Sequence, residues 1–187
     1  ASNTEVGREA LHANTTASSN TAVGKHALRA NTTGANNVSV GKDALLANTT
    51  GASNVAVGSL ALDANVTGSA NTAVGYNAAS ATTTDGVTAI GKDALELNTS
   101  GVNTAVGSNA LAAVTTGTGN TAMGNDALNV NTASNNTAVG KSALVANTTG
   151  AGNTAVGTFT LDANTTGATN TAVGYAALSA NTTVSYK

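Results

Sequence analysis

Apolar and polar positions recur along the whole chain with one short period, which is seventeen positions from Gly7 to Gly24 and sixteen from Gly75 to Gly91. One repeat, numbered from its asparagine, has the consensus N-T-A-V-G-x-x-A-L-x-A-N-T-T-G-x-x, and the chain holds eleven copies. Position 5 is always glycine: Gly7, Gly24, Gly41, Gly58, Gly75, Gly91, Gly107, Gly124, Gly140, Gly157 and Gly174. Because so short a unit cannot enclose a core of its own, the repeat predicts a solenoid in which each copy is one rung stacked on its neighbours.

The apolar positions inside the repeat indicate strands. Position 4 is aliphatic in every copy, position 9 is Leu in all but one, position 11 is always apolar, and position 2 is Thr or Val. These positions do not follow the helical period of 3.6, and Gly, Asn and Thr are weak helix formers. We therefore expect two short strands per rung, T-A-V and A-L-x-A, with positions 2 and 4 facing positions 9 and 11.

The predicted fold class is all-β, a parallel β-solenoid or β-roll of eleven rungs with a thin Val/Leu/Ala core. It covers residues 1–187 as a single repeat domain, with an atypical tail at 184–187. At ~4.8 Å per rung, the rod is roughly 50 Å long. Glycine at position 5 suits a turn with positive φ, and N-T-T-G suits the return turn. The core residues expected to carry assembly are Val23, Leu28, Val74, Val106, Leu111, Val139, Leu144, Val156, Leu161, Val173 and Leu178.

Position 3 is expected to point outward, opposite positions 2 and 4. It is nearly always Ala, with Glu5 and Ser39 as the other residues. A row of small apolar side chains on an outer face suits close lateral contact with another copy. The candidate contact residues are Ala22, Ala56, Ala73, Ala89, Ala105, Ala122, Ala138, Ala155 and Ala172.

Asparagine recurs at positions 1 and 12. Stacked asparagine side chains can hydrogen-bond along a fibre axis, so we expect them to satisfy turn backbone and join the rungs. The ladder at position 1 is Asn20, Asn37, Asn54, Asn71, Asn103, Asn120, Asn136, Asn153 and Asn170. The triplet Asn-Thr-Thr also matches the N-glycan acceptor pattern, although turn chemistry alone can produce it. The possible acceptors are Asn14, Asn31, Asn48, Asn147, Asn164 and Asn181.

Charge and composition narrow the function. Charged residues make up 9% of the chain, the net charge is −2, and Cys is absent. Most charges fall at positions 6, 7 and 10 and indicate one solvated edge, with no basic patch for nucleic acid and no apolar run for a membrane. There is no nucleophile elbow or phosphate loop, and His12 and His26 are interpreted as surface residues. We expect no catalytic, cofactor or metal site.

The motif N-T-A-V-G-x-x-A-L, as in Asn71 to Ala79 and Asn170 to Leu178, resembles the YadA-like head repeats of trimeric autotransporter adhesins and related bacterial and phage tail-fibre repeats. The resemblance implies a left-handed β-roll that trimerises and serves adhesion or spacing outside the cell. This period is longer than that of the family, and no stalk heptads are present.

Two partner arrangements and two further functions remain open. The partner is a second copy of the chain, as a homotrimer or as an end-to-end filament, with a host surface or glycan as a possible ligand. We expect a structural subunit of a fibre or adhesin, extracellular, at the cell surface or on a virion. One alternative is a module that binds ice, glycan or a host surface through Thr and Asn ladders, and another is a phage tail-fibre shaft.

Overall fold

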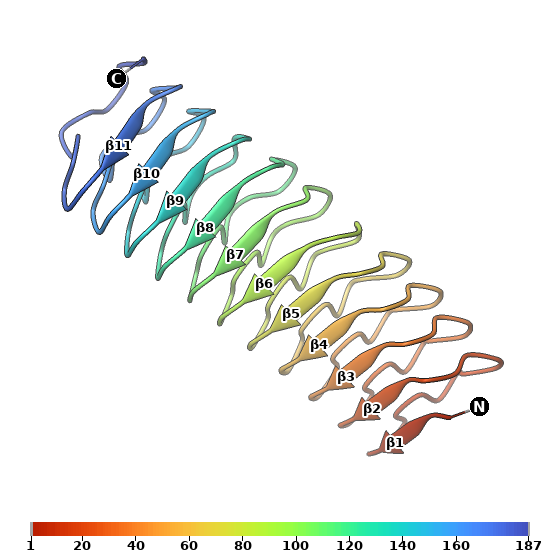
Figure 1. The fold of residues 1–187 in the computed structure, drawn as a ribbon. Helices are drawn as coiled ribbons and strands as arrows, with labels where there is room; N and C mark the ends of the chain where they lie inside the picture. The colour runs from red at the N-terminus through yellow and green to blue at the C-terminus, as the bar shows by residue number, and fades with distance from the viewer. Residues whose placement is uncertain (1, 187) are drawn as a thin grey trace.

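The computed structural model describes residues 2–186, which form one parallel sheet of eleven short strands and no helix (Figure 1). The strands are β1 (Thr4–Val6), β2 (Thr21–Val23), β3 (Val38–Val40), β4 (Val55–Val57), β5 (Thr72–Val74), β6 (Thr88–Ile90), β7 (Thr104–Val106), β8 (Thr121–Met123), β9 (Thr137–Val139), β10 (Thr154–Val156) and β11 (Thr171–Val173). Their order in the sheet is their order in the sequence, so each repeat forms one rung.

Equivalent repeat positions are stacked directly on one another. Thr104 pairs with Thr121 and Thr88, for example, and every neighbouring pair of strands keeps this register although some repeats are one position shorter than others. Figure 1 shows the strands side by side, with the rest of each rung folded behind them from β1 to β11. The predicted parallel β-solenoid is therefore confirmed.

The second strand predicted for each rung does not form. Positions 7 and 9 adopt left-handed backbone angles, as in His26 (φ 60°) and Leu28 (φ 54°), so A-L-x-A is a turn. The turns are nevertheless bonded between rungs, since the N–H of Leu28 donates to the carbonyl of Ala44 at 3.0 Å. Positive φ is a genuine outlier for β-branched residues, and neither position holds one in any repeat. Each rung thus has a single strand closed by a hydrogen-bonded turn.

The face of the strand that points into the core is the opposite of the one predicted. The alanines at position 3 form the core together with the alanines at position 8 and the leucines at position 9. Those predicted as lateral contacts are Ala22, Ala56, Ala73, Ala89, Ala105, Ala122, Ala138 and Ala155, all fully buried, and Ala172, at 5% exposure. They cannot touch another copy, so this lateral contact was predicted wrongly.

The valines predicted for the core lie on the outside of the sheet. Val23, Val74, Val106 and Val139 are half-buried, and Val156 and Val173 are exposed. The leucines predicted with them do lie in the core, apart from the partly exposed Leu178 of the last rung. The reason is the width of the rung: once the leucine occupies its centre, only a small side chain fits at position 3. Even Ser39 is accepted there only with its hydroxyl donated to the carbonyl of Ala44 at 2.8 Å.

The glycine at position 5 is required by both conformation and contact. At Gly107 φ is +136°, and an added Cβ would lie 2.5 Å from the carbonyl oxygen of Gly124 in the next rung. Position 15 is equally tight, since a Cβ on Gly34 would lie 2.2 Å from the oxygen of Gly51. These glycines allow the rungs to approach closely.

Candidate functional surfaces

The outer side of the sheet carries two straight rows of side chains, at positions 2 and 4, which we call the Thr/Val face. All of these residues are Thr, Val or Ile except Met123, and none is charged. Ile90 and Met123, in the middle rungs, are 39% and 46% exposed. Parallel sheets are normally covered on both sides, and a continuous exposed apolar surface marks an interaction site in soluble proteins. The Thr/Val face is therefore the strongest candidate interface on the molecule.

The position-1 asparagines are interior ties. The Oδ1 atom of Asn136 accepts the backbone N–H of Asn153 at 2.9 Å, and its Nδ2 atom donates to the carbonyl of Gly150, also at 2.9 Å. The same pattern recurs along the rod. All nine predicted ladder residues are buried: Asn20, Asn37, Asn54, Asn71, Asn103, Asn120, Asn136, Asn153 and Asn170. An external ligand has no access to them, which removes this ladder from the surface-binding alternative.

Position 12 forms a second interior ladder. Asn164 donates from Nδ2 to Oδ1 of Asn147 at 2.8 Å and to the carbonyl of Gly167 at 2.9 Å. The ladder is interrupted at Thr82 and Val114. Before the first interruption, the Oδ1 atom of Asn65 is buried without a hydrogen-bond partner.

Four of the six possible glycan acceptors are inaccessible in the folded rod. Asn31, Asn48, Asn147 and Asn164 are fully buried, and each donates its amide to a backbone carbonyl. A glycan would replace one hydrogen of the Nδ2 atom and could reach it only if the turn opened, so these four possible acceptors do not fit the folded rod. Asn14 and Asn181 are half-buried in the end rungs and make the corresponding backbone bonds at 3.3 and 3.1 Å.

The threonines at position 13 use their hydroxyls internally. Thr32 Oγ1 donates to the carbonyl of Thr49 in the next rung at 3.0 Å, and Thr148 does the same to Thr165. The threonines at position 14 are mostly exposed. The return turn therefore presents one row of engaged hydroxyls beside one exposed row.

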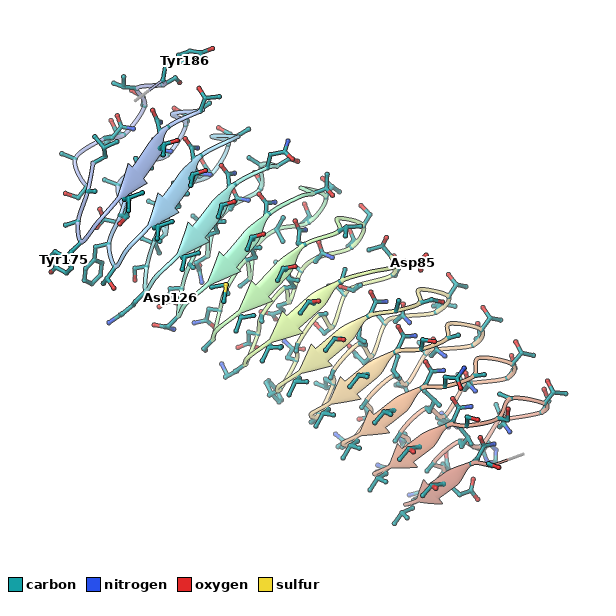
Figure 2. All side chains as sticks on the ribbon, viewed as in Figure 1. Asp85, Asp126, Tyr175 and Tyr186 are labelled. Atoms are coloured by element: carbon teal, nitrogen blue, oxygen red, sulfur yellow. The ribbon has the colours of Figure 1, made fainter. Side chains whose placement is uncertain are left out.

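Charged residues gather on the edge where the strands end. Figure 2 shows Asp126 and Tyr175 on this edge and Asp85 on the opposite one. In the first three rungs, Glu9 Oε2 lies 2.8 Å from Arg29 Nε, and His26 Nδ1 lies 2.9 Å from Asp43 Oδ1. The predicted charged edge thus contains an ion pair, Glu9–Arg29, and a hydrogen bond, His26–Asp43, that each cross from one rung to the next.

The ion pairs shift the carboxyl pKa values. Burial would raise the pKa of Glu9, but the charges of Arg29 and Arg8 outweigh burial and hold it below the ordinary value. At Asp43, burial would again raise the pKa. Hydrogen bonds from His26 and Lys42 outweigh it, so the pKa of Asp43 is also lowered. Asp63 differs: burial dominates and its pKa is raised.

Residues 2–186 contain no group of three His, Asp or Glu side chains placed to hold a metal ion. No helix within that range is long and apolar enough to cross a bilayer. A hollow of about 360 Å³ opens on the first three rungs. It is lined by His12, Ala13, Arg29, Ala30, Leu46 and Ala47.

The chain is a parallel β-solenoid repeat protein in which each short repeat forms one rung. Comparison with protein-family models, curated proteins and solved structures finds no match. Its function must therefore be argued from its own surfaces.

Proposed function

We propose that this chain is a structural segment of an extracellular self-assembling fibre or adhesin, without catalysis, whose copies meet through the Thr/Val face. The observation that carries the proposal is the uninterrupted, uncharged row of Val, Ile and Met at position 4 along all eleven strands. Burying such a row against an equivalent row removes apolar surface from water at about 25 cal/mol per Å². Because the same row is repeated on every rung, the gain grows with the length of the rod.

A homotrimer is the arrangement we favour. The face is only two side chains wide, so three rods with this face turned to a common axis would each cover the others' rows. The resemblance to YadA-like heads supports the same arrangement, and also supports a location outside the cell, at the cell surface or on a virion. An end-to-end filament through the edges of β1 and β11 is the other form of self-assembly, and phage tail-fibre shafts fit the same proposal.

The test is the mass of the purified chain in solution at micromolar concentration, by light scattering. We expect a trimer mass for the wild type. The double variant Ile90→Lys with Val106→Lys would place charges in the middle of the face and should give monomers. The matched control, Ser100→Lys with Thr116→Lys, places equal charges at position 14 and should leave the trimer intact. A monomeric wild type, or equal behaviour of the two variants, would refute assembly through this face.

A second candidate function, binding of ice, is favoured by one observation on the same face. Its β-branched side chains have restricted χ1 angles and stand in register on every rung, so they form a regular, rigid and uncharged array. Thermal hysteresis of the wild type is the test. Hysteresis from a monomer that loses it in the Ile90→Lys variant would favour ice, whereas a trimer without hysteresis would exclude this candidate.

A further inference from the structure

Cations are concentrated on three consecutive rungs near β1 to β3. Four of the seven Lys and Arg residues of the chain lie there: Arg8, Lys25, Arg29 and Lys42. Arg8, Lys25 and Lys42 all occupy position 6, so they are stacked at intervals of ~4.8 Å. We call these four residues the cationic corner. In the other rungs the cations at position 6 are Lys92 and Lys141, and neither has a cation at position 6 of a neighbouring rung.

The neighbouring carboxylates are recessed behind the cations. The side chain of Arg8 is 74% exposed, but that of its partner Glu9 is 28% exposed. Lys42 is 62% exposed, and its partner Asp43 is 14% exposed. Among the described residues, Lys25 has no ion-pair partner. At the corner itself the outermost side chains are therefore the cations, although the same rungs also hold the exposed Glu5 on β1.

An apolar hollow adjoins this positive surface. Arg29 belongs to both, because it binds Glu9 on one side and lines the hollow of about 360 Å³ on the other. The floor of the hollow is formed by the alanines at position 11 of three successive rungs, and Leu46 lies beside them. Charge and apolar contact are thus offered side by side, and both extend along the rod axis.

We propose that the cationic corner and the adjoining hollow bind an acidic polysaccharide that lies parallel to the rod. The cations recur on consecutive rungs, which complements a linear polymer with charges at regular intervals better than a single small anion. The alanine floor suits the apolar faces of sugar rings. The first three rungs contain no Phe, Tyr or Trp on which bases could stack, which argues against single-stranded nucleic acid.

This site is distinct from the Thr/Val face. It uses positions 6, 10 and 11, whereas assembly uses positions 2 and 4. A trimer formed through the Thr/Val face would leave three copies of the site available. Binding and assembly can therefore succeed or fail independently.

The test is binding of polygalacturonate to the wild-type chain at low ionic strength, with neutral dextran as the reference polymer. Removing two charges in Lys25→Gln with Lys42→Gln should weaken binding by roughly 25-fold, at about fivefold per cation beside an anionic surface. The matched control is Lys92→Gln with Lys141→Gln, because Lys92 is 63% exposed and paired with Asp93 much as Lys42 is with Asp43. The control should change binding less than threefold.

Three results with the polysaccharides would overturn the proposal, and a fourth comes from lipid vesicles. They are no binding of polygalacturonate, equal binding of dextran, and equal losses in the two double variants. Tighter binding to phosphatidylglycerol vesicles than to polygalacturonate would assign the corner to lipid headgroups instead and would also overturn it. Circular dichroism of each variant checks that the rod remains folded, and the mass in solution reports separately on assembly.

Discussion

The side-chain oxygen of Asn37 accepts the backbone N–H of Asn54 in the next rung at 2.9 Å. The same side chain donates to the carbonyl of Gly51 in its own rung, also at 2.9 Å. One buried amide thus closes a turn and joins two rungs. Since the pattern repeats along the rod, these asparagines hold the stacked turns where a globular protein would use a larger apolar core.

Replacing this amide should be costly. In Asn37→Ala, the buried N–H of Asn54 loses its partner, at about 1–3 kcal/mol for an unsatisfied group, whereas the carbonyl of Gly51 keeps its second bond, from Asn48 Nδ2 at 3.0 Å. Chemical denaturation followed by circular dichroism measures the change. The exposed Asn125→Ala is the control and should stay within about 0.5 kcal/mol of the wild type. Similar losses in the two variants would contradict the role given to the ladder.

Substitutions at two glycines distinguish the cost of backbone strain from the cost of contact between rungs. Gly107 and Gly174 both have positive φ, but a Cβ on Gly107 would lie 2.5 Å from the next rung, whereas a Cβ on Gly174 meets only the Ala177 Cβ at 4.0 Å. Gly107→Ala should therefore destabilise the rod more than Gly174→Ala, by about 1–3 kcal/mol for overpacking. Urea unfolding midpoints of the two variants provide the comparison. Equal midpoints would mean that the rungs can move apart at little cost.

The interruption of the second ladder can be repaired. Asn65 Oδ1 has no partner because Thr82 stands where an asparagine would donate to it. Asn131 shows that one of the shorter rungs accepts this side chain, with its amide donated to Ala133 at 2.9 Å. Thr82→Asn satisfies this oxygen but gives up the bond from the Thr82 hydroxyl to the carbonyl of Asn98 at 3.1 Å, so the free energy of unfolding should rise by only about 0.5–1 kcal/mol.

Thermal unfolding of the repaired variant against the wild type is the measurement. The matched change is Val114→Asn at the other interruption, where Asn98 Oδ1 already accepts a bond from Asn103. Val114→Asn should raise the unfolding temperature less than Thr82→Asn does. A Thr82→Asn variant no more stable than the wild type would show that the orphaned oxygen costs nothing.

The two kinds of carboxylate predict opposite pH effects. The pKa of Asp43 is lowered in the fold, so its stabilisation is present above its ordinary pKa of 3.8 and is lost as the pH falls below it. The pKa of Asp63 is raised, so its ionisation destabilises the fold as the pH rises through the shifted value. Asp43→Asn should lower the unfolding temperature at neutral pH, and Asp63→Asn should raise it.

Thermal melts of both variants from about pH 2 to 7 check the signs. Both differences from the wild type should shrink toward the acid end, where the carboxyl groups are protonated. A difference for Asp43→Asn that is constant across this range would mean that its charge contributes nothing and that only its shape matters.

The sequence predicted the rung, the parallel stacking and the turn glycines, because each depends on a strict period and on local backbone chemistry. It failed on which side of the strand faces the core. The expectation placed the largest side chains inside, but the leucine at position 9 already fills the narrow rung. The signal was variation in size: position 4 accepts Val, Ile and Met, whereas position 3 accepts only Ala or Ser after Glu5 of the first rung.

The prediction of a second strand in each rung failed for a related reason. Alternation at positions 9 and 11 matched a strand, but Leu28 and its equivalents have positive φ. The absence of β-branched residues at positions 7 and 9 was the available signal. The contacts of His26 with Glu9 and Asp43 could not be predicted from the residue types alone, because they depend on how closely successive turns are stacked.

The most direct test of assembly through the Thr/Val face is cysteine cross-linking. The chain has no cysteine, and Ile90 lies on the sixth of eleven strands, so its equivalents approach each other in any symmetric pairing of this face, parallel or antiparallel. Oxidised Ile90→Cys should run as a covalent dimer on a denaturing gel, whereas Ser100→Cys, in the return turn after the same strand, should remain a single chain. Cross-linking of Ser100→Cys alone, or of neither variant, would contradict the account.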